Sequence, residues 1–267
     1  MSIGTFCRVG LVVAAAALTA ACAGNGRHSG FTVDQAAINA AVDAPDRMPD
    51  DSKRDAARKP KEMLAFFGVA PGMKVLDVFT GGGWYAELEA RVVGPSGEVW
   101  AQNPPEYLKR FGDKDITARL ANNRLPNARR VDRSMDALEL PKAYFDGVVV
   151  NDVFHDLFWL TKGADGVPHV DAVARQLFEA TKKGGFVAIV DHSAPAGTGD
   201  AFARDISGQH RIDEALVKQL MQAAGFKLEA ESQALRNPAD DRSKPFFAPE
   251  MKGINTDKFA LRFRRPG

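Results

Sequence analysis

The chain has 267 residues, and its 35 basic side chains almost balance its 34 acidic ones. This balance, and the lack of a basic stripe with interleaved aromatic residues, argues against a nucleic-acid-binding protein. The length fits one α/β domain with additions. The two cysteines are Cys7 and Cys22. Removal of the first with a signal peptide would exclude a disulfide within the chain.

Residues 1–21 have the pattern of a secretory signal peptide, because Arg8 precedes an uncharged, Ala-rich run from Val9 to Ala21. The run is shorter than the roughly 20 residues of a membrane-spanning helix. It ends in Leu-Thr-Ala-Ala-Cys22, which is similar to a bacterial lipoprotein box, with Thr19 at the usual leucine position. We expect an exported, periplasmic protein with a tether at 22–32 and a lipid on Cys22 as its membrane contact. Ordinary cleavage near Cys22, giving a soluble periplasmic protein, is the alternative.

The elements that follow alternate between helices and strands. Helices are expected at 33–43, 61–67, 84–93, 105–123, 168–182 and 213–224, and strands at 74–79, 98–102, 129–132, 145–151, 186–191, 227–232 and 258–263. This alternation predicts a parallel sheet with helices on both faces. The last two strands have no helix between them, so they should pair antiparallel at one edge. We therefore expect one α/β, Rossmann-like domain at 33–267, with an N-terminal helical extension and a mostly parallel seven-stranded sheet. The charged run at 44–60 is interpreted as a solvated face.

The first predicted strand runs into Gly81, Gly82 and Gly83 and then into a helix. Such glycines let the backbone approach a ligand, and the helix N-terminus adds a positive dipole. Asp77 lies at the strand end, whereas dinucleotide-binding sites place their acid about 20 residues later. The spacing resembles the D-x-G-x-G-x-G loop of class I S-adenosylmethionine (SAM) methyltransferases, with Phe79 at the position of the first glycine.

Further segments resemble one bacterial group of exported, predicted class I SAM-dependent methyltransferases. They are Arg58-Lys59-Pro60, residues 64–73, Gly-Gly-Gly-Trp-Tyr at 81–85, His155-Asp156-Leu157, Lys183-Gly184-Gly185, Val190-Asp191-His192, His210-Arg211-Ile212-Asp213 and residues 235–242. The resemblance covers roughly residues 45 to 265. It implies the seven-stranded methyltransferase fold, SAM as the cofactor, and methyl transfer to an unidentified small-molecule or envelope acceptor.

The resemblance also implies a set of cofactor contacts at the carboxyl ends of the strands. Asn103 follows the second strand, where an acid usually holds the ribose of SAM, and Asp136 lies in the segment that contacts adenine. Trp84 begins the helix after the glycines and is placed to stack on adenosine or to attract the sulfonium. The full expected set is Asp77, Phe79, Gly81, Gly82, Gly83, Trp84, Asn103, Asp136 and Asn151.

Candidate proton-transfer residues follow the fourth and fifth strands, whose ends are neighbours in a parallel sheet. They are His155, Asp156 and His192, together with the downstream His210. A histidine beside a carboxylate is suited to proton transfer near neutral pH. The alternative is structural: His155 caps a helix, and Asp191-His192 fixes a loop. Carboxylates and imidazoles also bind divalent ions, but no H-x-x-x-H or H-E-x-x-H spacing occurs, so no metal ligand is expected.

Two other functions remain open. SAM is made in the cytosol and is charged, so a supply of SAM outside the inner membrane is not expected. This favours a scaffold that binds another small ligand without methyl transfer. A hydrolase or lyase that uses the His/Asp groups is the third hypothesis. The long segment at 236–257 is interpreted either as a lid, with Arg236 or Arg242 meeting an anionic substrate group, or as a surface insertion. The sequence does not predict the oligomeric state.

Overall fold

The computed structural model describes residues 1, 30–253 and 255–267. The predicted signal peptide, Cys22 and most of the predicted tether fall within 2–29, outside the described residues. Among the residues described, no helix is both long enough and apolar enough to cross a membrane.

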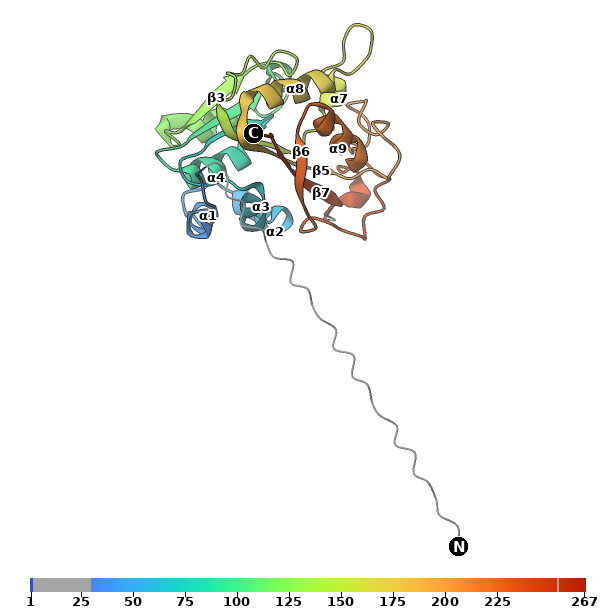
Figure 1. Ribbon diagram of the computed structural model, residues 1–267, viewed down its shortest axis with the longest axis horizontal. Helices are drawn as coiled ribbons and strands as arrows, with labels where there is room; N and C mark the ends of the chain where they lie inside the picture. Colours follow the sequence, from blue (N-terminus) through green and yellow to red (C-terminus); the bar gives the residue numbers. More distant parts are fainter. Residues whose placement is uncertain (2–29, 254) are drawn as a thin grey trace.

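A sheet forms the centre of the molecule (Figure 1). It has seven strands in the order β3-β2-β1-β4-β5-β7-β6. Every pairing is parallel except those of β7, which runs antiparallel to β5 and β6. The strands are β1 (Lys74–Val78), β2 (Glu98–Asn103), β3 (Ala128–Asp132), β4 (Phe145–Asn151), β5 (Thr181–His192), β6 (Lys227–Ser232) and β7 (Lys258–Arg264). The predicted fold class, including the antiparallel edge, is confirmed. The strand order reverses between β1 and β4, and ligands of such sheets bind outside the carboxyl ends at that point.

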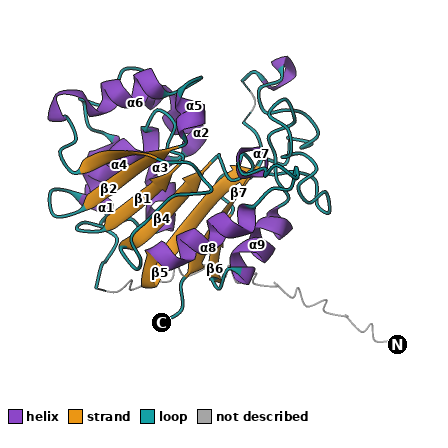
Figure 2. Cartoon of the chain, turned by 90° about the horizontal axis from the view of Figure 1, so that it is seen from above, coloured by secondary structure: helices purple, strands orange, loops and turns teal. Residues whose placement is uncertain are grey.

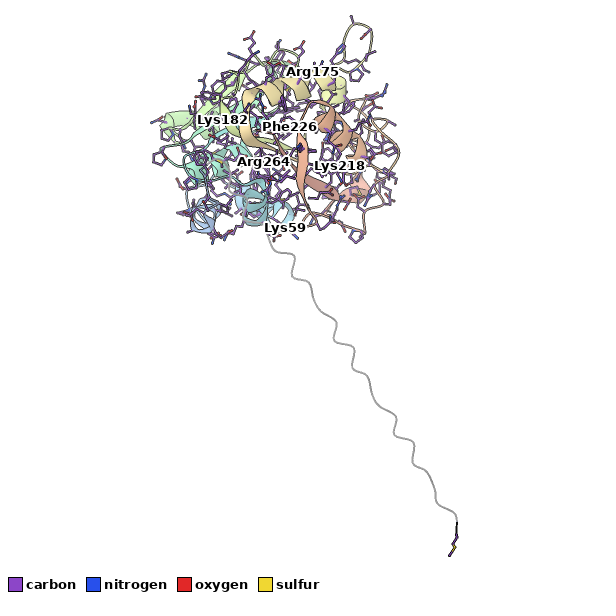
Figure 3. The ribbon with its side chains drawn as sticks, viewed as in Figure 1. Lys59, Arg175, Lys182, Lys218, Phe226 and Arg264 are labelled. Carbon is purple, nitrogen blue, oxygen red and sulfur yellow. The ribbon has the colours of Figure 1, made fainter. Side chains whose placement is uncertain are left out.

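Helices cover both faces of the sheet (Figure 2). On one face lie α1 (Gln35–Val42), α3 (Pro60–Phe67) and α4 (Trp84–Val93), and on the other lie α8 (Val170–Ala180) and α9 (Glu214–Ala223). Phe226, labelled in Figure 3, follows α9 and packs edge-on against Phe178 of α8 at 5.0 Å. Short helices complete the fold: η1 (Asp51–Arg54), α2 (Asp55–Arg58), α5 (Pro105–Leu108), α6 (Asp113–Leu120), η2 (Ala121–Asn123), α7 (Leu157–Leu160) and η3 (Pro249–Met251).

The helix predicted at 105–123 is wrong as a single element, because three short helices occupy that range. Gly112 separates α5 from α6 with φ of +75°, and a Cβ there would lie 2.8 Å from the Tyr107 ring. Asn122 also has a positive φ, of +55°. These left-handed residues break the helix, and Gly and Asn are the residues that adopt them most readily.

The charged run at 44–60 is not simply a solvated face. Asp51 is buried, and its carboxylate accepts a hydrogen bond of 2.7 Å from Nη1 of Arg119 on α6. The same guanidinium contacts Glu87 of α4 and donates from Nε to the carbonyl of Gly82 at 2.6 Å. Arg119 therefore ties the N-terminal extension, α4 and α6 to the glycine turn.

Two carboxyl groups are buried beneath this turn. Glu89 of α4 is completely buried, and neither of its carboxyl oxygens has a hydrogen-bond partner among the described residues. Burial, and then the charge of Asp77, raises the pKa of Glu89 well above its usual value. Burial also raises the pKa of Asp77 to about 7, although Thr80 donates a hydrogen bond of 2.5 Å to its carboxylate. Burial without a hydrogen-bond partner therefore favours the protonated form of Glu89.

The buried pair makes the free energy of unfolding fall as the pH rises. A carboxyl whose pKa is higher in the folded than in the unfolded state binds its proton more tightly when folded, so raising the pH through this interval favours unfolding. Replacing Glu89→Gln keeps the shape and removes one titration. We expect the stability of the variant, relative to that of the unmodified protein, to rise as the pH is raised from about 5 to about 8. Thermal unfolding across this range measures the difference, and parallel pH curves would contradict the prediction.

The segment between β6 and β7, residues 233–257, is anchored to the body of the domain by a buried ion pair. Arg211 is completely buried, and its guanidinium forms a two-pronged pair with Asp240 at 2.8 and 3.1 Å. Arg236 and Arg242, the two arginines predicted to meet a substrate anion, both contact the carboxylate of Asp257. Neither arginine lines the main cavity described below.

Replacement of Asp240→Ala leaves the Arg211 guanidinium buried without its counter-charge. Loss of one partner of a buried pair costs about 3–5 kcal/mol, so we expect a loss of this order in chemical denaturation. The adjacent Asp241 is exposed, and within the described residues its side chain hydrogen-bonds only locally, to Ser243. The matched control Asp241→Ala should change stability by less than about 0.5 kcal/mol. Equal effects of the two replacements would argue against the anchor.

Candidate functional site

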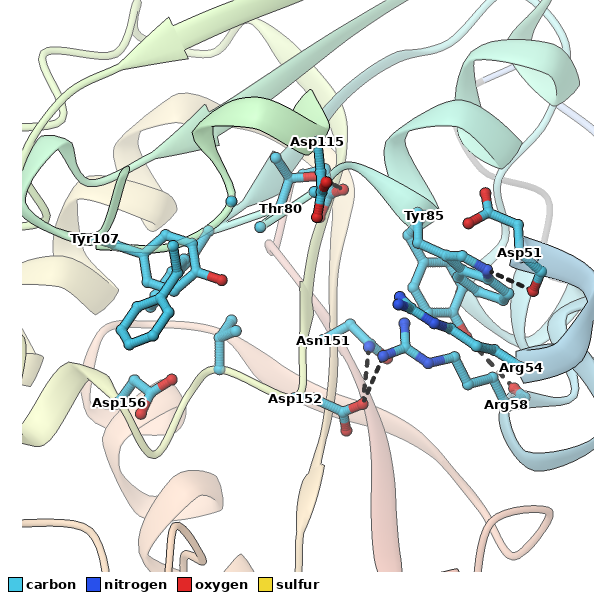
Figure 4. Close-up of a pocket in the computed structure, with 18 of the residues that line it drawn as sticks. Asp51, Arg54, Arg58, Thr80, Tyr85, Tyr107, Asp115, Asn151, Asp152 and Asp156 are labelled. Atoms are coloured by element: carbon cyan, nitrogen blue, oxygen red, sulfur yellow. Dashed lines mark hydrogen bonds and ion pairs between the residues drawn. The ribbon is translucent and has the colours of Figure 1, made fainter. Parts of the chain in front are cut away.

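A cavity of about 850 Å³ opens at the carboxyl ends of the strands, where the order reverses (Figure 4). Its walls combine the glycine turn after β1, the loops after β4 and β5, the α5–α6 segment and the η1–α2 segment. The predicted site residues that line it are Asp77, Phe79, Gly81, Gly82, Trp84, Asn151, His155, Asp156, His192 and His210. Gly83, Asn103 and Asp136 are not among the lining residues.

The glycine turn forms although a phenylalanine replaces its first glycine. Phe79 itself adopts a positive φ of +53°, a conformation that costs a side-chain-bearing residue about 1–2 kcal/mol. Its backbone N–H donates to Gln102 Oε1 at 2.9 Å, and its ring packs edge-on against Tyr107 at 4.6 Å. These contacts hold the left-handed backbone that glycine would supply without strain.

Two glycines of the turn are required by close packing. A Cβ on Gly82 would lie 3.0 Å from the Cβ of Asp115, and one on Gly83 would lie 2.7 Å from the Ile116 side chain. Both obstacles belong to α6, which covers the turn. Gly83 therefore permits helix packing, whereas Gly81 and Gly82 face the cavity.

Asn103 supports the turn instead of facing a ligand. It is completely buried; its Oδ1 accepts from the N–H of Gly81 and its Nδ2 donates to the carbonyl of Gly81, both at 2.9 Å. Both ends of the amide are thus in use. Asp136 is exposed, away from the cavity walls. The ribose and adenine contacts expected for these two residues stay predictions that the geometry does not support.

Trp84 is also committed to internal contacts. It is buried, and its Nε1 donates to the carbonyl of Asp51 at 3.1 Å. The guanidinium groups of Arg58 and Arg47 lie 4.9 and 5.6 Å from its ring centroid. Protein cations therefore already lie over the indole ring. This favours a packing role for Trp84 over contact with the sulfonium of SAM.

The cavity wall also holds charged residues that were not among the predicted site residues. Arg54 and Arg58 project from η1 and α2 toward Asp152 of the β4 loop (Figure 4). Burial opposes ionisation of Asp152, but Lys258 at 2.7 Å and the more distant Arg58 hold its pKa below its usual range. Its Oδ1 is buried with no hydrogen-bond partner in the part of the chain described. The resemblance of Arg58-Lys59-Pro60 was the available signal for this group.

These charges fit SAM. A cofactor with an α-ammonium, an α-carboxylate and a sulfonium needs an anionic acceptor and a cationic donor within one cleft. The carboxylate of Asp152 suits the ammonium, and the guanidinium groups of Arg54 and Arg58 suit the carboxylate. Gly81 and Gly82 leave the backbone open to close approach.

The predicted catalytic residues meet around the carboxylate of Asp191, at the end of β5. Asp191 Oδ1 lies 2.7 Å from Nδ1 of His155, and Oδ2 accepts from the backbone N–H of His155 at 2.8 Å. The other ring nitrogen of His155 lies 3.2 Å from Nδ1 of His210 and 3.3 Å from Oδ1 of Asp156. The structure therefore brings these residues together from three separate segments.

The positive charge of this cluster lies on the imidazole of His155. Burial disfavours the imidazolium, but Asp191 and Asp156 outweigh burial and raise the pKa of His155 to about 10. In the absence of another cation, this side chain is protonated at neutral pH and is not a proton acceptor. Its backbone N–H and ring bond to Asp191, so it does not cap α7.

His192 differs in its protonation. Burial and the nearby Lys258 lower its pKa well below the usual value, so its imidazole is neutral. Nδ1 lies 2.6 Å from Thr256 Oγ1, and the ring stacks on Phe246 at 4.7 Å with an interplanar angle of 6°. A neutral imidazole in a cavity wall can accept a proton.

Comparison with known proteins adds sequence evidence to the fold. No protein-family model matches the chain. A ubiquinone/menaquinone biosynthesis C-methyltransferase, UbiE, from Burkholderia cenocepacia is 27% identical over 192 residues, which cover 61% of this chain and 71% of that protein.

Solved structures share the architecture. A SAM-dependent methyltransferase from Aquifex aeolicus has a TM-score of 0.56 at 18% identity, over 88% of this chain and 100% of the other. A second from Mesorhizobium loti has a TM-score of 0.53 at 16% identity, over 79% and 99%. These structures establish the fold, and the sequence relative carries the same enzyme class. The chain therefore has the fold of the class I SAM-dependent methyltransferases and is similar in sequence to a methyltransferase.

Proposed function

We propose that the protein transfers the methyl group of SAM to a small-molecule acceptor bound in the same cavity. This proposal rests mainly on one observation: a single cavity is lined both by the glycine turn and by the histidine cluster at the ends of β4 and β5. When bound, SAM supplies a methyl group activated by its cationic sulfur. Alignment of the acceptor with that methyl group is the main contribution of the protein.

The chain's own residues divide this work. Asp152, Arg54 and Arg58 hold the charged end of the cofactor, and the backbone at Gly81 and Gly82 accommodates its close approach. The neutral ring of His192 accepts a proton from the acceptor, while Lys258 and Thr256 fix its position and charge state.

The acceptor is expected to be a flat molecule. Tyr107, Phe111 and Phe246 place aromatic surfaces in the cavity wall, and such surfaces bind rings by offset stacking or edge contacts. The UbiE relative is named for methylation at carbon in quinone biosynthesis, which supports a ring compound as the acceptor class.

Titration of SAM into the purified protein by calorimetry tests the cofactor. We expect a dissociation constant on the order of micromolar, or about −8 kcal/mol. Asp77→Ala and Gly82→Arg should each weaken binding at least tenfold, because the first changes the base of the turn and the second fills the space against Asp115.

Lys142→Ala is the control, because this exposed side chain pairs only with Glu179 in the described structure. It should leave SAM binding unchanged. Circular dichroism must show that each variant is folded. Absence of SAM binding at millimolar ligand would contradict the proposal and direct attention to hydrolysis or lyase chemistry at the His/Asp cluster.

We also propose that the protein is exported and anchored by a lipid on Cys22. The uncharged run from Val9 to Ala21 and the box that ends at Cys22 support this. Expression with radiolabelled palmitate should label the membrane fraction, and Cys22→Ser should abolish the label. Label-free protein in the periplasmic fraction would instead indicate ordinary cleavage, and protein retained in the cytosol would contradict export.

A further inference from the structure

Three donor atoms at the cavity wall form an almost equilateral triangle. His155 Nε2 lies 3.2 Å from His210 Nδ1 and 3.3 Å from Asp156 Oδ1, and the third side, from His210 Nδ1 to Asp156 Oδ1, is 3.1 Å. An ion bound about 2.0–2.2 Å from nitrogen and oxygen ligands holds adjacent donors about 3.0–3.4 Å apart. The triangle therefore has the dimensions of one face of a metal coordination sphere.

Hydrogen bonds on the far side of each imidazole direct its remaining nitrogen to the triangle. Asp191 already accepts from the backbone N–H of His155 and of His192, so it acts as an acceptor and His155 Nδ1 is the donor. His210 Nε2 donates to the carbonyl of Ile206 at 2.7 Å. Metal-binding histidines show this pattern: a carboxylate or carbonyl fixes the ring and its tautomer.

The remaining donor is a carboxylate oxygen, and its surroundings favour a cation. Asp156 Oδ1 accepts from Trp159 Nε1 at 2.8 Å, which orients the carboxylate. Both Asp156 and Asp191 place negative charge around the triangle. All three ligating residues line the cavity, and the side chains of Asp156 and His210 remain 14% and 13% exposed. An ion held there would keep open positions toward the cavity.

We propose that His155, Asp156 and His210 bind a divalent first-row transition-metal ion through Nε2, Oδ1 and Nδ1. Two imidazoles and one carboxylate on one face are suited to Zn²⁺, Fe²⁺ and related ions. The site stands independently of the proposed function.

A role for the ion in methyl transfer does rest on the proposed function. A metal at this wall binds a hydroxyl or enolate oxygen of the acceptor and lowers its pKa. The ion then fixes the acceptor, and His192 on the neighbouring strand end receives the released proton.

Metal titration of the chelator-stripped protein, without a histidine tag, tests the site. Zn²⁺ is titrated by calorimetry, and Co²⁺ by the absorption bands that report its coordination. We expect one ion per chain. His210→Ala and Asp156→Asn each remove one ligand while leaving the buried His155 in place. Each should weaken binding by at least about tenfold.

His169→Ala is the matched control, because His169 is an exposed histidine outside the cavity wall. It should bind Zn²⁺ and Co²⁺ as the unmodified protein does. Circular dichroism must show that the variants fold. Absence of Co²⁺ bands and Zn²⁺ heat at millimolar metal would overturn the proposal, as would undiminished binding by both ligand variants. SAM titration is separate, so failure of the metal site and failure of the methyltransferase proposal are distinguishable.

Discussion

The buried carboxylate of Asp191 is the interaction on which the histidine cluster depends. It accepts hydrogen bonds from the ring and backbone N–H of His155 and from the backbone N–H of His192. Because Asp191 belongs to β5, an interior strand, these bonds tie the loop after β4 to the sheet. These N–H donors compensate the carboxylate for the loss of water. Removal of a donor would leave a buried charge with too few hydrogen bonds, which would destabilise the fold.

A second requirement concerns the glycine turn, where side chains hold a strained backbone in place. Phe79 takes a left-handed conformation without the freedom of glycine. Amides from the next strand, Gln102 and Asn103, bind the backbone of Phe79 and Gly81, and Arg119 binds the carbonyl of Gly82. Polar side chains that other sites of this type direct at a ligand here maintain the shape of the site itself.

The sheet was predictable because its signals are local. Apolar runs, the glycine turn and the missing helix before β7 were sufficient for the fold class. The convergence of His155, Asp156 and His192 also followed from the topology, since neighbouring parallel strands end at one edge. His210 was expected beside them because its segment lies between the fifth strand and the next helix, where it can fold back over the cleft.

The rest depended on contacts that no local pattern contains. Asp51 pairs with Arg119 68 residues away, so a run that looked solvated is in part buried. Asn103 was predicted to hold ribose from its position at a strand end, but its partner is the backbone of Gly81. The metal-type triangle joins Asp156 to a histidine 54 residues later, a separation that short ligand motifs do not describe.

The buried Arg211–Asp240 pair links the histidine cluster to the segment before β7. Arg211 is the residue after His210, and Asp240 also accepts from the backbone N–H of Asp257, next to the Thr256 that contacts His192. Opening of this segment would therefore disturb both histidines at once. We therefore expect the segment and the two histidines to open together in local unfolding, which couples the integrity of the reaction centre to the loop between β6 and β7.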